Sequence, residues 1–153
     1  MIKLYKKINN ELHYWEAWEN DKDDAIVHWG IVGQEGETKV IQSSFKNKLD
    51  KLIKKCVLEG YKEIDLESHF ILMVEYKVDG MGTDGDNAKR HALQDKLQEI
   101  LGWTGLGHCD GGSIGSGTME SCCYVVDFDI AQKVIIERLK NTIFQDYSRI
   151  FQE

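Results

Sequence analysis

A chain of 153 residues with an apolar share of 42% can fill the core of one ordinary domain or two small ones, which excludes a disordered or fibrous protein. The net charge of −7 argues against general attraction to nucleic acid or anionic lipid. The balance is uneven, because residues 1–66 hold 11 lysines and 12 acidic side chains, whereas residues 67–153 hold 8 basic and 14 acidic ones.

The sequence predicts a cytoplasmic protein without membrane contact. Lys3, Lys6 and Lys7 near the start are not followed by an apolar segment of signal-peptide length. The longest apolar runs, such as residues 70–74, are far shorter than the about 20 residues of a membrane span. The cysteines form no CxxC pair, and we expect free buried thiols at Cys56, Cys109, Cys122 and Cys123.

The first half predicts four strands followed by a helix. Short aromatic and β-branched runs predict strands at 2–8, 12–18, 25–32 and 37–42, and the Asn, Asp and Gly clusters between them predict turns. Helical spacing then begins, with Ser43 or Ser44 as a cap and Gly60 as the left-handed terminator. The apolar positions of this helix are Phe45, Leu49, Leu52, Ile53, Cys56 and Val57.

The second half predicts alternating strands and helices. A buried strand is expected at 70–78, a helix ended by Gly102 after it, a strand at 119–128 and a helix at 130–139 capped by Asp127 or Asp129. The tail, 143–151, suits either a last strand or a continuing helix. The residues that mark the first of these helices are Ala88, His91, Ala92, Asp95, Leu97, Ile100 and Leu101.

The predicted fold class is therefore α+β, in two parts. Residues 1–66 form an antiparallel sheet with one helix, and residues 67–153 form a two-layer α/β sandwich. The second part has the ferredoxin-like element order if the stretch 107–114 supplies a hairpin arm. The join at 61–68 contains no Pro, Ser/Gly or low-complexity linker, so it is expected to be short.

The glycine-rich stretch 107–117 is the most unusual segment of the chain. It leads into a strand rather than a helix, which excludes a dinucleotide loop, and it lacks the Gly-Lys-Ser/Thr ending of a P-loop. The simplest interpretation is a hairpin or bulge that needs positive backbone angles. The alternative is a pocket of backbone N–H groups for an anion or a partner's chain end, with His108, Asp110, Gly111 and Gly112 as candidate residues.

No segment of the chain predicts a cofactor, a metal ion or catalysis. Consecutive side chains at 108–110 do not converge easily on one ion, and residues 79–86 fail the EF-hand spacing and suit a helix cap instead. No signature places a Ser or Cys nucleophile beside a base on a strained turn. We therefore expect a nonenzymatic protein.

Several spaced residues of the first half resemble the WGR domain. Trp29-Gly30-Ile31 is followed by Val32-Gly33, by Gly36, by Phe45 with a lysine-rich helix, and by Gly60-Tyr61. Ile31 replaces the arginine of the family's name. The resemblance covers residues 1–66 and implies a noncatalytic module, which in nuclear poly(ADP-ribose) polymerases helps to bind DNA ends. By position, Trp29 is then the ring that packs on a sugar or base, and Gly30 allows close approach.

A lysine-rich segment supports part of this implication independently. From 39 to 62 seven lysines stand against Asp50 and Glu59, a local charge of +5 that could neutralise a few phosphates. The competing interpretations are a solvated helix face, or docking on the acidic half. The candidate binding lysines are Lys39, Lys46, Lys48, Lys51, Lys54 and Lys55.

Two functions follow from these features. The first is a nonenzymatic binding or adaptor protein whose WGR-like part contacts nucleic-acid ends or a protein partner. The alternative is an inhibitor or immunity-type protein that covers a basic active site with its acidic second half. For Trp29 the competing interpretation is packing in the core or on a sheet face, since aromatic residues at alternate strand positions, as with Trp15, Trp18 and Trp29, often have that role.

Overall fold

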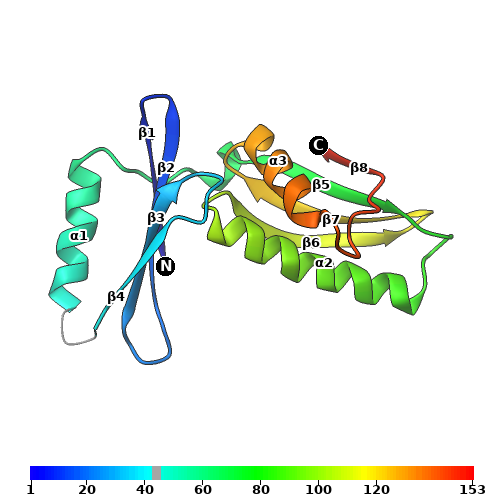
Figure 1. Cartoon of the computed structure of the whole chain (residues 1–153), viewed down its shortest axis with the longest axis horizontal. Coiled ribbons are helices and arrows are strands. Elements are labelled where there is room, and N and C mark those ends of the chain that lie inside the picture. The colour runs from blue at the N-terminus through cyan, green and yellow to red at the C-terminus, as the bar shows by residue number, and fades with distance from the viewer. Residues whose placement is uncertain (43–45) are drawn as a thin grey trace. The chain divides into compact units, whose positions relative to one another are not determined.

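The computed structural model describes residues 1–42 and 46–153, with the side chain of Lys46 left out. Ser43, Ser44 and Phe45, proposed above as caps and as the first apolar helix position, lie outside the described residues. The chain divides into two compact units, unit 1 (Met1–Asp65) and unit 2 (Leu66–Glu153). Within the described ranges there are three α-helices and two antiparallel four-stranded sheets (Figure 1), which confirms the α+β class.

Unit 1 contains a meander of four antiparallel strands in chain order, β1-β2-β3-β4. All four expected strands are present, with ends within one residue of the predicted ones. The first turn has Asn9 and Asn10 at positive φ, 51° and 67°, as a tight hairpin between twisted strands requires. The bounds are Ile2–Ile8 for β1, Glu11–Glu19 for β2, Ala25–Ile31 for β3 and Glu37–Ile41 for β4.

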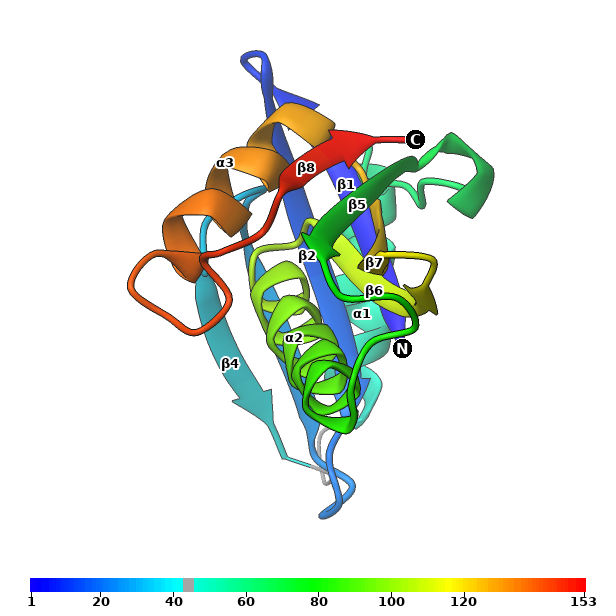
Figure 2. The ribbon, with the colours of Figure 1, turned by 90° about the vertical axis from the view of Figure 1, so that its right-hand side faces the viewer.

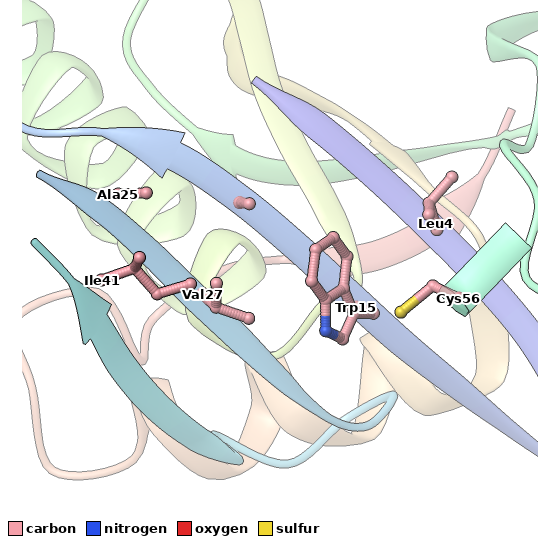
Figure 3. Packing of buried hydrophobic residues seen from close by; sticks show 7 residues of the cluster. Leu4, Trp15, Ala25, Val27, Ile41 and Cys56 are labelled. Carbon is pink, nitrogen blue, oxygen red and sulfur yellow. The ribbon is translucent and has the colours of Figure 1, made fainter. Parts of the chain in front are cut away.

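Helix α1 (Lys46–Leu58) packs on one face of this sheet and closes its core. Figure 3 shows Cys56 of α1 beside Trp15, with Leu4 of β1 nearby. Gly60 has φ 101°, and the Tyr61 N–H donates to the Cys56 carbonyl oxygen at 3.0 Å, the bond that closes a Schellman motif. The predicted role of Gly60 as the left-handed terminator is thus confirmed.

Unit 2 has the element order strand–helix–strand–strand–helix–strand, after a short 3-10 turn at Leu66–Ser68. The glycine-rich stretch supplies the hairpin arm, which was the condition for the ferredoxin-like element order. The sheet order is β6-β7-β5-β8, with all neighbours antiparallel. The bounds are Phe70–Lys77 for β5, Asp84–Trp103 for α2, Gly107–Gly115 for β6, Thr118–Val125 for β7, Phe128–Leu139 for α3 and Arg149–Gln152 for β8.

The two helices of unit 2 lie side by side on one face of its sheet (Figure 2). On β5 the buried residues of that face alternate, as the two-residue period of a strand requires: Leu72, Val74 and Tyr76. On the adjacent β7 every second side chain is likewise buried, from Met119 to Val125. The core of unit 2 therefore lies between this face and the two helices.

Two helix boundaries in unit 2 depend on side-chain caps. Thr83 and Asp86 form a reciprocal capping box at the start of α2, as expected for a loop that ends in a helix cap. The Asp127 carboxylate accepts from the Ile130 N–H at 2.9 Å, which confirms one of the two proposed caps of α3. Because Asp127 caps the helix, β7 ends at Val125 rather than at 128.

The prediction that Gly102 ends α2 is wrong. The helix continues to Trp103, and the left-handed residue is Gly105, with φ 67°. The Leu106 N–H donates to the Leu101 carbonyl at 3.0 Å, and the buried Thr104 hydroxyl donates to the Ile100 carbonyl at 2.7 Å. These bonds satisfy carbonyls that the helix end leaves free, so the left-handed residue that terminates the helix is Gly105 rather than Gly102.

The end of the chain is a strand, β8, whereas residues 143–148 before it are neither strand nor helix, so the strand alternative for 143–151 holds only from Arg149 onward. Ile150 faces Val74 in the register of β8 with β5, and its side chain is buried.

Across the described residues, no helix combines the length and the apolar character that crossing a bilayer requires.

Candidate binding cleft

A cleft of about 290 Å³ opens between α1 and the β3–β4 side of the sheet in unit 1. Aromatic and apolar side chains form its floor, and charged side chains stand among its lining. Its residues are Trp15, Val27, Trp29, Lys39, Leu52, Lys55, Cys56, Glu59 and Tyr61. Two of the predicted binding elements, Trp29 and the lysine-rich segment, therefore meet in one concave place.

The path of α1 across the sheet explains why this face is left open. The helix begins soon after β4 and contacts it. At its other end, a Cβ atom added at Gly60 would lie 3.6 Å from Lys6 Cε on β1, and Lys6 Nζ lies 5.9 Å from the centre of the Tyr61 ring. Thus α1 crosses from the β4 edge to the β1 edge. Because four strands span about 14 Å and one helix covers about 10 Å, part of β3 and β4 stays uncovered.

Strand register places the cleft floor. Trp15 and Trp29 face each other across β2 and β3, and Val27 faces Lys39 across β3 and β4. Residues directly opposite in an antiparallel pair share a face, as do alternate residues of one strand. All four side chains thus lie on the face that α1 covers in part. Trp15 is 8% exposed, whereas Trp29 is half-buried at the margin of the core cluster.

The floor of the cleft is uncharged near neutral pH, and its charges lie at the rim. Burial raises the pKa of the Cys56 thiol and of the Tyr61 hydroxyl, so both groups keep their protons. Lys55 is 71% exposed and lies 3.9 Å from Glu59, a solvent-screened pair that does not immobilise the ammonium group. Lys39 is exposed on β4. Two exposed cations and the Glu59 carboxylate therefore border an apolar, aromatic surface.

Three of the predicted helix lysines follow one flank of α1. Lys48, Lys51 and Lys55 have the spacing i, i+3, i+7, which places them on the same side of a helix, and Lys55 itself lines the cleft. All three are exposed. Lys54 is also exposed but is turned by about 100° from Lys55 around the helix axis. The side chain of Lys46 lies outside the described part of the chain.

Gly30 has a packing role within its own unit. A Cβ atom at Gly30 would lie 2.9 Å from the Gly36 Cα and 3.1 Å from the Tyr14 hydroxyl oxygen. The Tyr14 hydroxyl donates to the Gln34 carbonyl at 2.7 Å, and the His28 ring contacts the Glu35 carbonyl oxygen. The close approach expected at Gly30 is therefore made by the chain's own 33–36 turn.

A buried polar group on β2 and β3 anchors the same turn, and the sequence analysis did not identify it. His28 Nδ1 lies 2.7 Å from Glu16 Oε1, and Lys3 Nζ lies 3.4 Å from Glu16 Oε2. His28 is fully buried and Glu16 is 2% exposed. Along β2 and β3 these two residues alternate with the core residues Trp15 and Val27, and this two-residue period places their side chains on the second face of the sheet. We assign them a structural role, because buried polar groups of this kind fix a fold when they are paired.

The residues of the proposed glycine-loop site are spread along β6. The His108 ring stacks on Tyr124, with centroids 5.5 Å apart, on the face opposite to Cys109. Asp110 and Gly111 lie in a bulge between Cys109 and Gly112. A Cβ atom at Gly112 would lie 2.2 Å from the Glu120 carbonyl oxygen, so glycine is required for strand pairing there. The stretch is thus a strand with a bulge, as its simplest interpretation predicted.

Comparison with known proteins adds no relative. No family model, no curated protein and no solved structure matches this chain.

Proposed function

We propose that this chain is a nonenzymatic binding protein whose unit 1 cleft receives the terminal nucleotide of a nucleic-acid strand. In this proposal the Trp29 ring packs on the base or sugar, and Lys39 and Lys55 neutralise the phosphate. The observation that carries the proposal is that a half-buried indole and two exposed ammonium groups line the same cleft. The WGR resemblance of residues 1–66, whose implied function is binding to DNA ends, agrees with this assignment.

The size and chemistry of the cleft favour a chain end over a continuous duplex. A volume of about 290 Å³ lies at the lower limit of small-ligand pockets, which is room for one planar group with its sugar. Aromatic rings stack on any base, so we expect little sequence preference. Ile31, which stands in place of the family's arginine, is half-buried and adds no charge, so phosphate binding depends on the lysines.

The net charge of −7 makes the interaction weak and local. Four lysines border the cleft or continue along its flank: Lys39, Lys48, Lys51 and Lys55. If all four neutralise phosphates of a single strand, the slope of log K against log salt is about −0.7 × 4, or about −3. We expect dissociation constants of about 10 to 100 µM at low salt, the range of nonspecific binding, and steep weakening as salt is added.

Fluorescence anisotropy with labelled DNA tests the proposal. Linear single strands, blunt duplexes and nicked duplexes are compared with circular single strands and closed dumbbells of the same length, which have no ends. We expect binding only to the molecules with ends, or at least a tenfold preference for them. Equal affinity for circular and linear strands, or no binding at low salt, would refute the proposed end recognition.

A pair of double variants tests the assigned lysines at constant charge. Lys39→Ala with Lys55→Ala removes the two cations of the cleft, and Lys7→Ala with Lys22→Ala removes two exposed cations elsewhere in unit 1. The first pair is expected to lower the magnitude of the salt slope by about 1.4 for single strands, and the second to leave it nearly unchanged. If both pairs change the slope equally, binding does not take place in the cleft.

A further inference from the structure

Two of the four cysteines face each other across neighbouring strands of unit 2. Cys109 on β6 is directly opposite Cys123 on β7. Cys123 is completely buried and Cys109 is 9% exposed. Both side chains point to the face that α2 and α3 cover, because Cys123 alternates with the half-exposed Cys122. The two thiols are therefore neighbours inside the core of unit 2.

The hydrogen bonds around this pair identify its type. The Val126 N–H donates to the Leu106 carbonyl, which makes residues 106 and 126 a hydrogen-bonded pair. Hydrogen-bonded and non-hydrogen-bonded pairs alternate along an antiparallel ladder, so residues 109 and 123, three positions further along, form a non-hydrogen-bonded pair. In agreement, the Cys109 N–H donates to Gln98 Oε1 at 2.8 Å instead of to β7. Such pairs have Cα atoms about 4.5 Å apart. Disulfides form between Cα atoms about 4.4 to 6.8 Å apart.

We propose that Cys109 and Cys123 form a reversible oxidation site, in which a small-molecule disulfide of the glutathione type closes a bond between β6 and β7. The strand positions already satisfy the distance that a disulfide needs, so little backbone movement is required. The bulge begins directly after Cys109, with Gly111 at φ 84°, and provides an irregular segment that adjusts to closure.

The surroundings of the two thiols assign their order of reaction. Cys109 lies on the edge strand β6 and is the more accessible one, so it reacts first. The Cys123 thiol donates a hydrogen bond to the Cys109 sulfur, which lowers the pKa of Cys109, whereas this bond and burial raise the pKa of Cys123. A thiolate is the nucleophile in thiol–disulfide exchange, and this contact favours it at Cys109.

The exchange has two balanced steps. The Cys109 thiolate attacks one sulfur of oxidised glutathione, which forms a mixed disulfide and releases one glutathione thiolate. The Cys123 sulfur attacks the Cys109 sulfur and its proton passes to the departing glutathione sulfur, which forms the Cys109–Cys123 bond and releases the second glutathione as a thiol. The protein gives up two electrons and two protons, and one molecule of oxidised glutathione becomes two of reduced glutathione. An excess of reduced glutathione reverses both steps.

Thiol counting on the full chain tests the site. After incubation with oxidised glutathione and removal of the reagent, the protein is denatured without reductant and its free thiols are titrated. We expect two of the four thiols to disappear, to return with reduced glutathione, and to map to one peptide pair containing Cys109 and Cys123. Four remaining thiols, or a bond that includes Cys56 or Cys122, would overturn the proposal.

Alanine variants separate this chemistry from a loss of folding. Cys123→Ala removes the second thiol without burying a new polar group, and it is expected to accumulate a glutathione adduct on Cys109. Cys122→Ala and Cys56→Ala should form the bond as the unmodified chain does. Circular dichroism before oxidation confirms that each variant is folded. A folded Cys123→Ala variant without an adduct would contradict the assigned order, and with it the site.

Discussion

Replacing Gly36 by alanine probes how tightly the 33–36 turn packs against Tyr14 and the backbone of β3, on the second face of the sheet of unit 1. Gly36 has φ 68°, and an added Cβ atom would lie 2.1 Å from the Trp29 carbonyl oxygen and 2.6 Å from the Tyr14 hydroxyl oxygen. Real Cβ contacts are not shorter than 3.0 Å, so the turn must shift by 3.0 − 2.1 = 0.9 Å. The obstacle at Trp29 is backbone, which cannot rotate away.

The expected cost follows from three contributions. A left-handed conformation costs a non-glycine residue about 1 to 2 kcal/mol. A shift of the turn weakens the Tyr14–Gln34 hydrogen bond and the contact of His28 with Glu35, and each hydrogen bond contributes about 1 kcal/mol. We therefore expect Gly36→Ala to lower the unfolding free energy of unit 1 by about 3 kcal/mol, with a range of about 2 to 4.

Urea unfolding followed by tryptophan fluorescence measures this loss, because Trp15, Trp18 and Trp29 lie in unit 1 and only Trp103 lies in unit 2. Gly102→Ala is the matched control, since its Cβ atom would meet nothing within 4 Å inside α2. That change should stabilise unit 2 by about 0.5 to 1 kcal/mol. A loss below about 1 kcal/mol for Gly36→Ala would refute the steric argument.

Three further substitutions test unit 2. Leu97→Ala empties a fully buried position of α2 and should lower the unfolding free energy by about 3 to 5 kcal/mol, measured by urea unfolding followed by circular dichroism. A loss below about 1 kcal/mol would show that the core closes over the space. Asp127→Ala removes the cap of the Ile130 N–H and should cost about 1 kcal/mol in the same assay, whereas an unchanged midpoint would mean that solvent replaces the carboxylate. Hydrogen bonds from Arg149 lower the pKa of Glu75 below its ordinary value. This pair therefore stabilises the fold at pH values above about 4.3, the pKa of a glutamate in the unfolded chain, and the stabilisation is lost as the pH falls through the lower pKa of Glu75 in the folded protein. Glu75→Gln should therefore make stability fall less steeply below pH about 4, and an unchanged acid profile would exclude the pair as its source.

Short-range patterns in the sequence were sufficient for most elements. The four strands of unit 1 follow from alternating β-branched and aromatic residues between Asn, Asp and Gly turns, and Gly60 ends α1 as its position predicts. The Asp127 cap of α3 follows in the same way. These features are decided by contacts within about four residues, which a local pattern contains completely.

Other local signals were ambiguous because glycine fits more than one role. Gly102 and Gly105 both suit a helix terminus, and only the bond from Leu106 to Leu101, with the buried Thr104 hydroxyl, selects Gly105. Similarly, the glycines of 107–115 suit a loop as well as a strand. Pairing with β7 makes them a strand, since Gly112 leaves room for the Glu120 carbonyl.

The amino-acid sequence by itself determined the class of the fold, the order of the elements in unit 1 and the residue types that could bind an anion. Tertiary packing alone decided which side chains lie next to one another. The diagonal path of α1 brings Lys55 to the same cleft as Trp29 and Lys39, and the register of β6 with β7 places Cys109 opposite Cys123. The physical reason is distance along the chain. A helix crossing angle and a strand register depend on side chains far apart in sequence, and they are set only when the whole core closes.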